Sequence, residues 1–296
     1  MRWILGAFLA LAAAVVAASL YTGWGKQRGK PVVCIGSTSI QPLAELLAEE
    51  YCRKDKGPDC GVDVQGGGST AGIQAILEGI ADIGMCSRSL KPAEAEQLQG
   101  IPIALDGLAV VVHKSNPVSQ LTRGQIRAIF AGEVTRWSQV GGADEPIDLI
   151  TREEGSGTRE AFVKLVMEHK DPQPAAASQP PTAGTLPASG ANHAVRISRK
   201  AMTQESNGAV KELVKHNRRA IGYMSLGLVH DELKVIAVDG LYPTSELVRQ
   251  KHYPLMRPFL FVVRGTVSAA AQGYIDFVLS EEGQRLLEKE GLVSVR

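Results

Sequence analysis

Three segments near the start of the chain share one order of elements: an apolar strand, a short polar junction and an amphipathic helix. Strands are predicted at residues 32–36, 62–65 and 81–86, where apolar residues recur. The helices that follow them carry apolar residues at helical spacing, as in Ile73 and Ile76 of the second one. Strands that alternate with helices predict a parallel sheet in an α/β fold.

Two longer apolar strands are predicted further along the chain, at residues 108–113 and 259–263. The segments between and after them give strands at 147–150, 221–226 and 234–238, a helix near 208–216 and a closing helix from about 269 to 290. We expect the two longer strands to cross between two lobes. Lobe I would then be discontinuous, with residues 30–112 and 228–296, and lobe II would comprise residues 113–227.

Two segments interrupt this pattern. Residues 171–192 are rich in Pro, Ala and Ser and lack periodicity, which predicts a loop insertion or disordered flap within lobe II. Residues 1–29 hold an early arginine and an apolar run from Trp3 to Ala18, which predicts a secretory signal or signal anchor with a linker. The run is short for a membrane span, so cleavage is favoured, and the remaining chain is expected outside the cytoplasm.

Composition and charge narrow the possible partners. The 296 residues are 44% hydrophobic and 21% charged, with a formal net charge of +1 and no block of like charges. This is the balance of an ordinary globular protein with one large or two medium domains. Nucleic-acid binding usually leaves a basic stripe, and its absence excludes that partner class.

Four cysteines are present, and outside the cytoplasm they favour disulfides over metal. Cys52 and Cys60 bracket a short polar loop, and we predict a disulfide between them. Cys34 and Cys86 lie in apolar strands, where burial as small hydrophobic residues is at least as good an interpretation as a bond.

The strand-to-helix junctions carry the candidate chemistry. All three early junctions hold small hydroxyl residues, and a fourth, at residues 151–158, reads Thr-Arg-Glu-Glu-Gly-Ser-Gly-Thr. Any one such serine is more often a helix N-cap than a ligand. Four junctions of this kind would meet at the carboxyl edge of a sheet, where helix N-termini attract anions. With the guanidinium of Arg152, they predict an anion site that needs no metal or cofactor.

Catalytic motifs fit this chain poorly. No Gly-Lys-Ser/Thr follows the run at 155–158, as a nucleotide-hydrolysing phosphate loop would require. Residues 155–159 read Gly-Ser-Gly-Thr-Arg, which is not a nucleophile elbow. None of the six histidines stands in a motif with a carboxylate and a serine. A secreted phosphohydrolase is therefore the less favoured reading.

Five motifs, taken in order, resemble one known family. They are GSTSIQPLAE (36–45), GGGSTAG (66–72), DIGMCSRSL (82–90), REEGSGTR (152–159) and QESNGAV (204–210). From about Pro31 to its end, the chain is similar to the periplasmic phosphate-binding proteins of ABC-type phosphate importers. The stretch YPLMRPFLFVV (253–263) also resembles that family's second crossover. The resemblance implies a two-lobed, type II-like periplasmic binding protein, with a mixed sheet in each lobe and the ligand cleft between the lobes.

The same resemblance implies a set of ligand residues. It assigns phosphate binding to Thr38, Ser39, Ser69, Ser87, Arg152, Ser156, Gly157 and Thr158. It also implies that an acidic residue two positions after the arginine, Glu154, holds Arg152 in place. Glu153 receives no role and is interpreted as a solvated loop charge.

One position departs from a well-known branch of the family. That branch has an aspartate where this chain has Ser87, and the aspartate accepts the proton of bound phosphate, which sulfate lacks. A hydroxyl can accept or donate, so Ser87 discriminates poorly between the two anions. We consider Asp106, at the start of the first crossover strand, as the proton acceptor. A solvent-exposed turn cap beside Gly107 is an equal alternative for Asp106.

Together these features predict an extracytoplasmic solute-binding protein that captures inorganic phosphate and delivers it to the membrane permease of an ABC importer. We expect a monomer with no enzymatic activity. The alternatives are the binding of another tetrahedral oxyanion such as sulfate, a secreted phosphohydrolase, and a signalling or adhesion module that keeps the fold.

Overall fold

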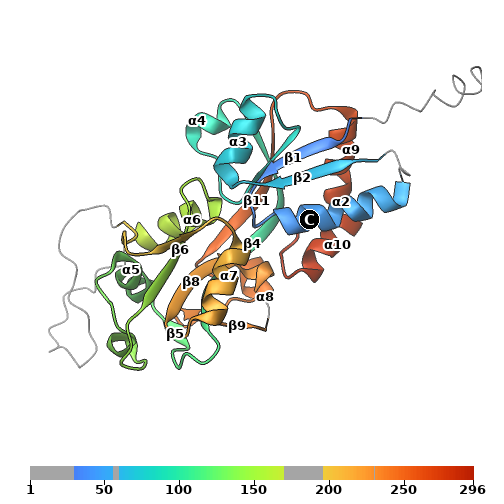
Figure 1. The fold of residues 1–296 in the computed structure, drawn as a ribbon. Helices are drawn as coiled ribbons and strands as arrows, with labels where there is room; N and C mark the ends of the chain where they lie inside the picture. Colours follow the sequence, from blue (N-terminus) through green and yellow to red (C-terminus); the bar gives the residue numbers. More distant parts are fainter. Residues whose placement is uncertain (1–29, 56–59, 170–195, 230) are drawn as a thin grey trace, which may run out of the picture.

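The computed structural model describes residues 30–55, 60–169, 196–229 and 231–296 (Figure 1). The predicted signal segment (1–29) and the predicted insertion (171–192) lie outside the described residues. Within the described ranges, every helix is too short or too polar to cross a membrane.

Lobe I contains the first half of the sheet, in the strand order β2-β1-β3-β11-β4. The strands are β1 (Val32–Gly36), β2 (Val62–Gly66), β3 (Ile83–Cys86), β11 (Met256–Val263) and the first part of β4 (Gln99–His113). The helices are α2 (Gln41–Asp55), α3 (Ser69–Leu77), α4 (Pro92–Ala95), α9 (Ala269–Val278) and α10 (Glu281–Lys289) (Figure 1). β1 is parallel to β2 and β3, as the alternation of strands and helices predicted.

Lobe II contains the other half of the molecule. Its strands are β5 (Gln120–Leu121), β6 (Asp148–Arg152), β7 (Met202–Gln204), β8 (Ala220–Ser225), β9 (Leu233–Val235) and β10 (Ala237–Val238). Its helices are α5 (Arg123–Ala131), α6 (Gly157–Phe162), α7 (Asn207–His216) and α8 (Ser245–Arg249), with short helical turns at η2 (Trp137–Val140), η3 (Val163–Met167) and η4 (Leu226–Leu228). β6 runs parallel to β7 and β8, whereas β8 is antiparallel to β4. In lobe I, β11 is antiparallel to β3, so the sheet is mixed in both lobes.

The long strand β4 joins the two lobes. Its residues 99–107 pair with β11 in lobe I, and its residues 108–112 pair with β8 in lobe II. The predicted apolar strand at 108–113 is thus the lobe II part of a strand that begins in lobe I. β11 pairs with β3 and with the lobe I part of β4, so the chain re-enters lobe I where β11 begins, near Met256.

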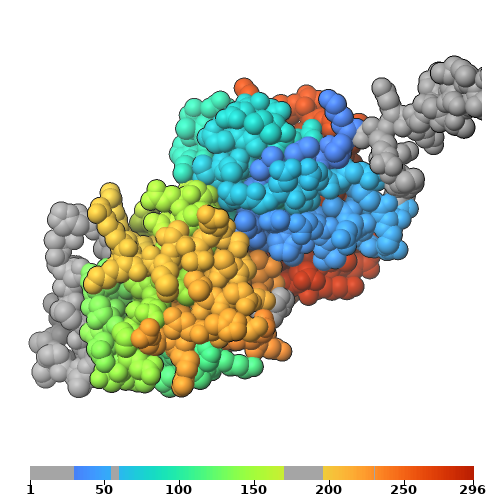
Figure 2. All heavy atoms as spheres, viewed as in Figure 1, coloured from blue at the N-terminus to red at the C-terminus, as the bar shows by residue number. Residues whose placement is uncertain are grey.

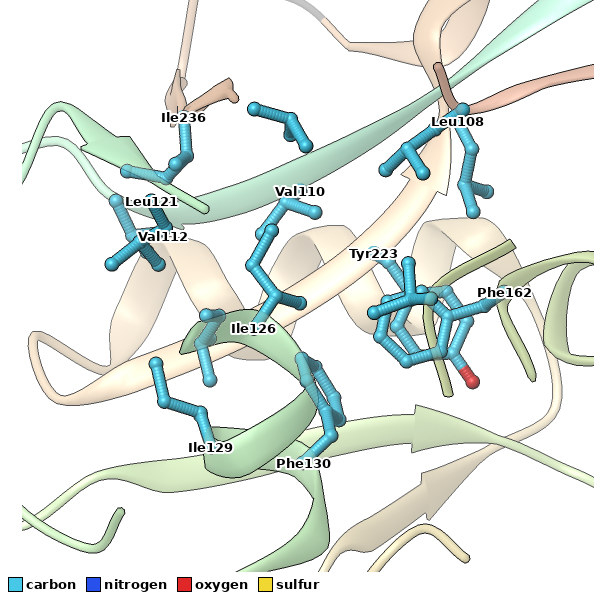
Figure 3. Packing of buried hydrophobic residues seen from close by; sticks show 14 of the residues in the cluster. Leu108, Val110, Val112, Leu121, Ile126, Ile129, Phe130, Phe162, Tyr223 and Ile236 are labelled. Atoms are coloured by element: carbon cyan, nitrogen blue, oxygen red, sulfur yellow. The ribbon is translucent and has the colours of Figure 1, made fainter. Parts of the chain in front are cut away.

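Two large buried clusters mark the cores of the lobes. One contains Ile40, Met85 and Phe261, and the other contains Leu108, Phe130, Phe162 and Tyr223 (Figure 3). The second cluster also takes in buried residues from the segment that the sequence assigned to lobe I, namely Ile236, Val238, Val248, Tyr253 and Leu255. Because these side chains pack in the lobe II core, we propose that lobe I resumes near Met256 and not at residue 228.

Two predicted elements divide in the structure. The closing helix forms α9 and α10, because Ser280 caps α10 by accepting a hydrogen bond from the N–H of Gly283 at 3.2 Å. The strand predicted at 234–238 forms β9, which pairs with β4, and β10, which pairs with β5. The strand therefore divides where its pairing partner changes from β4 to β5.

The cysteines follow the sequence analysis. A disulfide links Cys52 and Cys60, as predicted. Cys34 and Cys86 are free and fully buried, and burial raises the pKa of both thiols, that of Cys34 to about 12. Both therefore pack as small hydrophobic side chains.

Candidate functional site

The parallel strands of lobe I bring three polar junctions to one edge of the sheet. Thr38 and Ser39 follow β1, Ser69 begins α3, and Ser87 follows β3. Ser39, Ser69 and Ser87 are fully buried. The backbone N–H of Ser87 donates to Ser69 Oγ at 3.0 Å, and the two hydroxyl oxygens lie 3.3 Å apart. Three junctions far apart in sequence thus place hydroxyl groups in one buried region.

The β6–α6 junction of lobe II packs directly against these serines. A Cβ atom at Gly157 would lie 2.2 Å from Ser69 Oγ and 2.7 Å from Ser87 Oγ, so a side chain there would displace both hydroxyl groups. Thr158 Oγ1 lies 2.9 Å from Ser39 Oγ, and the N–H of Thr70 donates to the carbonyl of Gly155 at 3.0 Å. The space-filling view shows the lobes in contact along this boundary on the face in view (Figure 2).

Arg152, at the end of β6, is 1% exposed and held from several sides. Its Nε and Nη2 donate to the two carboxylate oxygens of Glu153, both at 2.9 Å. Nε also donates to the carbonyl of Gln204 (3.1 Å), and Nη2 to the carbonyl of Glu205 (3.2 Å) and to Thr38 Oγ1 (3.1 Å). The third nitrogen, Nη1, is buried and has no hydrogen-bond partner among the described residues. This nitrogen can donate to a bound anion.

The lobe II core supports the strand that carries Arg152. Tyr223 stacks on Phe162, with ring centroids 4.0 Å apart and planes 3° from parallel (Figure 3). Its hydroxyl lies 2.7 Å from Thr151 Oγ1 and accepts from the N–H of Arg152 at 3.3 Å. The end of β6 is therefore fixed by both packing and hydrogen bonds.

A second arginine, Arg257, lies behind the hydroxyl groups and is 3% exposed. Its Nε donates to Asp106 Oδ2 at 2.9 Å, and its Nη2 lies 2.8 Å from the same oxygen in an ion pair. Its Nη1 donates to Thr158 Oγ1 at 2.8 Å and to the carbonyl of Ser87 at 3.3 Å, while Nη2 also donates to Ser39 Oγ at 3.2 Å. Burial raises the pKa of Asp106 and lowers that of Arg257, and each charge partly offsets the effect on the other.

Asn207, at the start of α7, completes the buried network. Its Nδ2 donates to Ser39 Oγ at 2.9 Å and to Thr38 Oγ1 at 3.4 Å, and its Oδ1 accepts from the N–H of Ser225 at 3.2 Å. The amide therefore links the first lobe I junction to lobe II.

A charged group of four residues, here called the edge cluster, lies along the boundary beside this network. It comprises Arg88, Lys91 and Glu94 of lobe I and Glu160 of lobe II. Arg88 donates to both oxygens of Glu94 at 2.7 and 2.9 Å, and its Nε lies 3.0 Å from Glu160 Oε2. Lys91 Nζ lies 3.0 Å from the same oxygen of Glu160. The edge cluster thus joins the two lobes by ion pairs.

The chemistry of the site follows from this inventory. Two arginines are balanced by two carboxylates, and the surrounding groups are mainly hydroxyls. Among the described residues, no group of three or more His, Cys, Asp or Glu could hold a metal ion. One unpartnered guanidinium nitrogen among hydroxyl groups suits a small oxyanion, since guanidinium groups bind such anions with strong, directional hydrogen bonds.

The comparisons with known proteins agree with this geometry. Residues 22–282 match the family described as the PBP superfamily domain. The chain belongs to this family. Among solved structures, this PBP superfamily chain is 38% identical to a Clostridium perfringens protein described as a substrate-binding protein of a phosphate ABC transporter, with bound phosphate. The alignment covers 90% of this chain and 100% of that one, with a TM-score of 0.79.

Two further relatives of this PBP superfamily protein are informative. An ABC-type phosphate transport receptor from Vibrio cholerae is 35% identical, covers 88% of this chain and 99% of its own, and has a TM-score of 0.68. The phosphate-binding protein PstS of Bacillus subtilis is 27% identical over 265 residues, which are 88% of this chain and 79% of that protein.

Most of the predicted ligand residues of this PBP superfamily protein lie close to one another in the structure. Hydrogen bonds and close packing, with Asn207 and Arg257 as links, join seven of them in one network: Thr38, Ser39, Ser69, Ser87, Arg152, Gly157 and Thr158. Ser156 is buried beside them, and its Oγ accepts from the N–H of Arg159 at 3.3 Å, as a helix N-cap does. The interpretation of a junction serine as a cap therefore applies at Ser156.

The prediction that Glu154 holds Arg152 is wrong. Glu153 makes both carboxylate bonds to the guanidinium, whereas the side chain of Glu154 is 93% exposed and lies 3.9 Å from Arg159. The N–H of Glu153 still bonds to the carbonyl of Gln204 at the end of β7, which fixes Glu153 beside Arg152. Glu154 lies one residue further, in the turn before α6.

Neither expectation for Asp106 describes its surroundings. It is 1% exposed, so it is not a solvent-exposed turn cap. Its Oδ1 accepts from Ser225 Oγ at 2.8 Å, and its Oδ2 accepts from Arg257. The carboxylate is therefore held by an arginine and a serine, and the role of proton acceptor for a ligand loses its geometric support.

The sequence analysis missed Arg257 and Asn207 as members of the site. Both lie in motifs that carried the family resemblance, YPLMRPFLFVV and QESNGAV. An arginine at the start of an apolar strand was the available signal for Arg257. Asn207 gave a weaker signal, because an asparagine at a helix start is usually interpreted as a cap.

Proposed function

We propose that this protein is an extracytoplasmic solute-binding protein that captures inorganic phosphate and delivers it to the permease of an ABC importer. The observation that carries the proposal is the unpartnered, buried Nη1 of Arg152, whose neighbouring Nη2 donates to Thr38 Oγ1 in the network of buried hydroxyl groups. The relatives, which include a protein solved with bound phosphate, support phosphate as the anion.

The closed arrangement of the site supports a role in capture without chemistry. Ser39, Ser69, Ser87, Arg152 and Thr158 are all at most 1% exposed, so the lobes must separate for an anion to enter and leave. No nucleophile with an adjacent general base was identified in the sequence motifs. Such a site suits binding and release, and delivery to a permease requires both.

A second anion is favoured by one observation. The two carboxylates that pair with Arg152 and Arg257, namely Glu153 and Asp106, both accept hydrogen bonds from these arginines. A dry site that prefers phosphate over sulfate needs an acceptor for the phosphate proton, and these carboxylates are already engaged. Sulfate binding by the same site is therefore the second candidate function.

Calorimetric titration of ligand-stripped, signal-free protein with phosphate and then with sulfate tests the proposal. We expect saturable 1:1 binding of phosphate. Binding of sulfate alone would replace phosphate with the second candidate, and binding of neither anion would refute both. Release of product from a generic phosphoester by the purified protein would instead support the phosphohydrolase alternative.

A further inference from the structure

The two buried arginines of the site differ in how many of their N–H groups the protein uses. A guanidinium has five N–H donors and no acceptor. For Arg257 hydrogen bonds use four of the five: Nε donates to Asp106, one Nη2 hydrogen to Ser39, and the two Nη1 hydrogens to Thr158 and the Ser87 carbonyl. Nη2 also lies 2.8 Å from Asp106 Oδ2 in an ion pair. All three guanidinium nitrogens of Arg257 therefore have a hydrogen-bond partner in the protein, whereas Nη1 of Arg152 has none among the described residues.

The fold fixes Arg257 in this position. Arg257 on β11 and Asp106 on β4 are directly opposite each other in the antiparallel pairing, at the point where β4 passes between the lobes. Ser225, on the neighbouring strand β8, holds the second oxygen of Asp106. The guanidinium thus lies at the junction of the lobes, with its two terminal nitrogens directed at hydroxyls from both.

The bonds to Ser39 determine the direction of its hydroxyl proton. Ser39 Oγ accepts from Arg257 Nη2 and from Asn207 Nδ2, neither of which can accept a hydrogen bond in return. A hydroxyl has two lone pairs, so both are occupied. The Ser39 proton must then point outward, and the oxygen of Thr158, at 2.9 Å, is its described acceptor.

The same reasoning applies to Thr158. Its Oγ1 accepts from Arg257 Nη1 at 2.8 Å and from the Ser39 hydroxyl, which occupies both lone pairs. Its own proton has no acceptor among the described contacts and is available to a ligand. Hydrogen bonds are thus donated in one direction, from Arg257 and Asn207 to Ser39 and from Ser39 to Thr158.

We propose that Arg257, held by Asp106, is a positioning residue that forces the hydroxyl of Thr158 to present its proton to the bound anion. This inference rests on the proposed phosphate-binding function and deepens it. Arg257 does not touch the ligand, and its charge is balanced by Asp106, so its effect passes through Thr158 and Ser39. At Thr158 the site then binds only an unprotonated oxygen of the ligand. Both lone pairs of Thr158 Oγ1 are occupied, so this hydroxyl cannot accept a hydrogen bond from a protonated oxygen.

A mutant cycle between Arg257 and Thr158 tests this role. The paired variant Arg257→Met/Asp106→Asn removes both charges together, because removing one partner alone would leave a buried unpaired charge. Phosphate affinity is measured by calorimetry for the wild type, the paired variant, Thr158→Val and their combination. We expect each of the first two variants to bind about tenfold more weakly, and the combination to bind about tenfold to twentyfold more weakly.

Thr158→Ser is the matched control, since it keeps the hydroxyl and removes only a methyl group. In that background the paired variant should again cost about tenfold in affinity. The inference would be overturned if the paired variant and Thr158→Val together weakened phosphate binding by the product of their separate effects, about a hundredfold. Independent losses would mean that Arg257 does not act through Thr158. A paired variant with unchanged affinity would overturn it as well.

Arg257→Lys covers the case in which the paired variant does not fold. A lysine keeps the charge opposite Asp106, but its single nitrogen cannot reach Asp106, Ser39 and Thr158 as the two terminal nitrogens of arginine do. We expect Arg257→Lys to bind phosphate about fivefold more weakly than the wild type. In a protein that already carries Thr158→Val, adding Arg257→Lys should leave the affinity unchanged. Wild-type affinity in Arg257→Lys would overturn the inference. Wild-type protein that fails to bind phosphate would instead refute the proposed function, and this inference with it.

Discussion

Arg152 and Arg88 are both buried arginines at the lobe boundary, yet their glutamate partners lie in different places. Arg152 takes Glu153 from its own lobe and keeps Nη1 without a partner among the described residues. Arg88 takes Glu94 from its own lobe and reaches Glu160 across the boundary. Arg152 thus keeps a nitrogen for the proposed ligand, while the ion pair of Arg88 with Glu160 spans the lobe boundary. The same pair of residue types is therefore expected to serve binding in one place and closure in the other.

The largest expected effect comes from removing the guanidinium that is prepared for a ligand. A charged hydrogen bond contributes about 1.5–3 kcal/mol, and Arg152 has two N–H groups available on Nη1. We expect Arg152→Ala to weaken phosphate binding at least about tenfold in calorimetric titration. Arg123→Ala, which removes a partly exposed ion pair with Asp239 in the same lobe, is the control and should bind as the wild type does. Unchanged affinity in Arg152→Ala would place the anion elsewhere.

The next effect separates two neighbouring glutamates. Glu153→Gln removes the charge that holds Arg152 in two hydrogen bonds, and we expect phosphate affinity to fall about fivefold. Glu154→Gln is its matched control, because that side chain is 93% exposed, and its affinity should stay within about twofold of the wild type. Equal losses in the two variants would contradict the assignment of Glu153.

A smaller effect is expected at the edge cluster. Glu160 forms ion pairs with Arg88 and Lys91 across the boundary, and its side chain is 27% exposed. Partly exposed ion pairs contribute little, so we expect Glu160→Gln to weaken phosphate binding by about threefold. Part of this loss should disappear at high salt, since salt already screens the pair in the wild type. Titrations of both proteins at low and high ionic strength measure this difference, and an equal ratio at both would contradict a role in closure.

The sequence could predict those parts of the site that depend on residues close together in the chain. Ser69, Ser87 and the run at 155–158 follow strands directly, so their convergence at one sheet edge followed from the α/β pattern. The parallel pairing of β1 with β2 and β3, the disulfide and the burial of Cys34 and Cys86 were predictable for the same local reasons.

The parts that sequence could not predict depend on contacts between distant segments. Asp106 and Arg257 are 151 positions apart, and only the register of β4 against β11 brings them together. Glu153 and Glu154 are identical in type and adjacent, so only the end of the β6–β7 pairing decides which one faces Arg152. The placement of residues 233–255 against lobe II likewise depends on β9 pairing with β4 and on β10 pairing with β5.

The smallest expected effect is on the pH dependence of folding stability, and it comes from Glu94 in the edge cluster. Burial alone would raise the pKa of Glu94, but hydrogen bonds from Arg88 and from the N–H of Lys91 lower it below its ordinary value of 4.5. A carboxyl group with a lowered pKa in the folded protein stabilises the fold above the unfolded pKa. That contribution is lost as the pH falls through the folded value. We therefore expect Glu94→Gln to flatten the decline in stability below about pH 4.5.

Thermal unfolding of the wild type and Glu94→Gln, measured from pH 7 down to pH 3, tests this expectation. The two curves should lie furthest apart at neutral pH and converge on acidification, because protonation removes the same interaction in the wild type that the substitution removes. Glu246→Gln is the matched control, since its carboxylate is 58% exposed in a surface pair with Arg249, and its curve should follow the wild type throughout. A constant gap between the wild type and Glu94→Gln at every pH would show that the substitution acts through packing. The charge on Glu94 would then have no part in holding Arg88, and the contrast between the two arginines would rest on Glu160 alone.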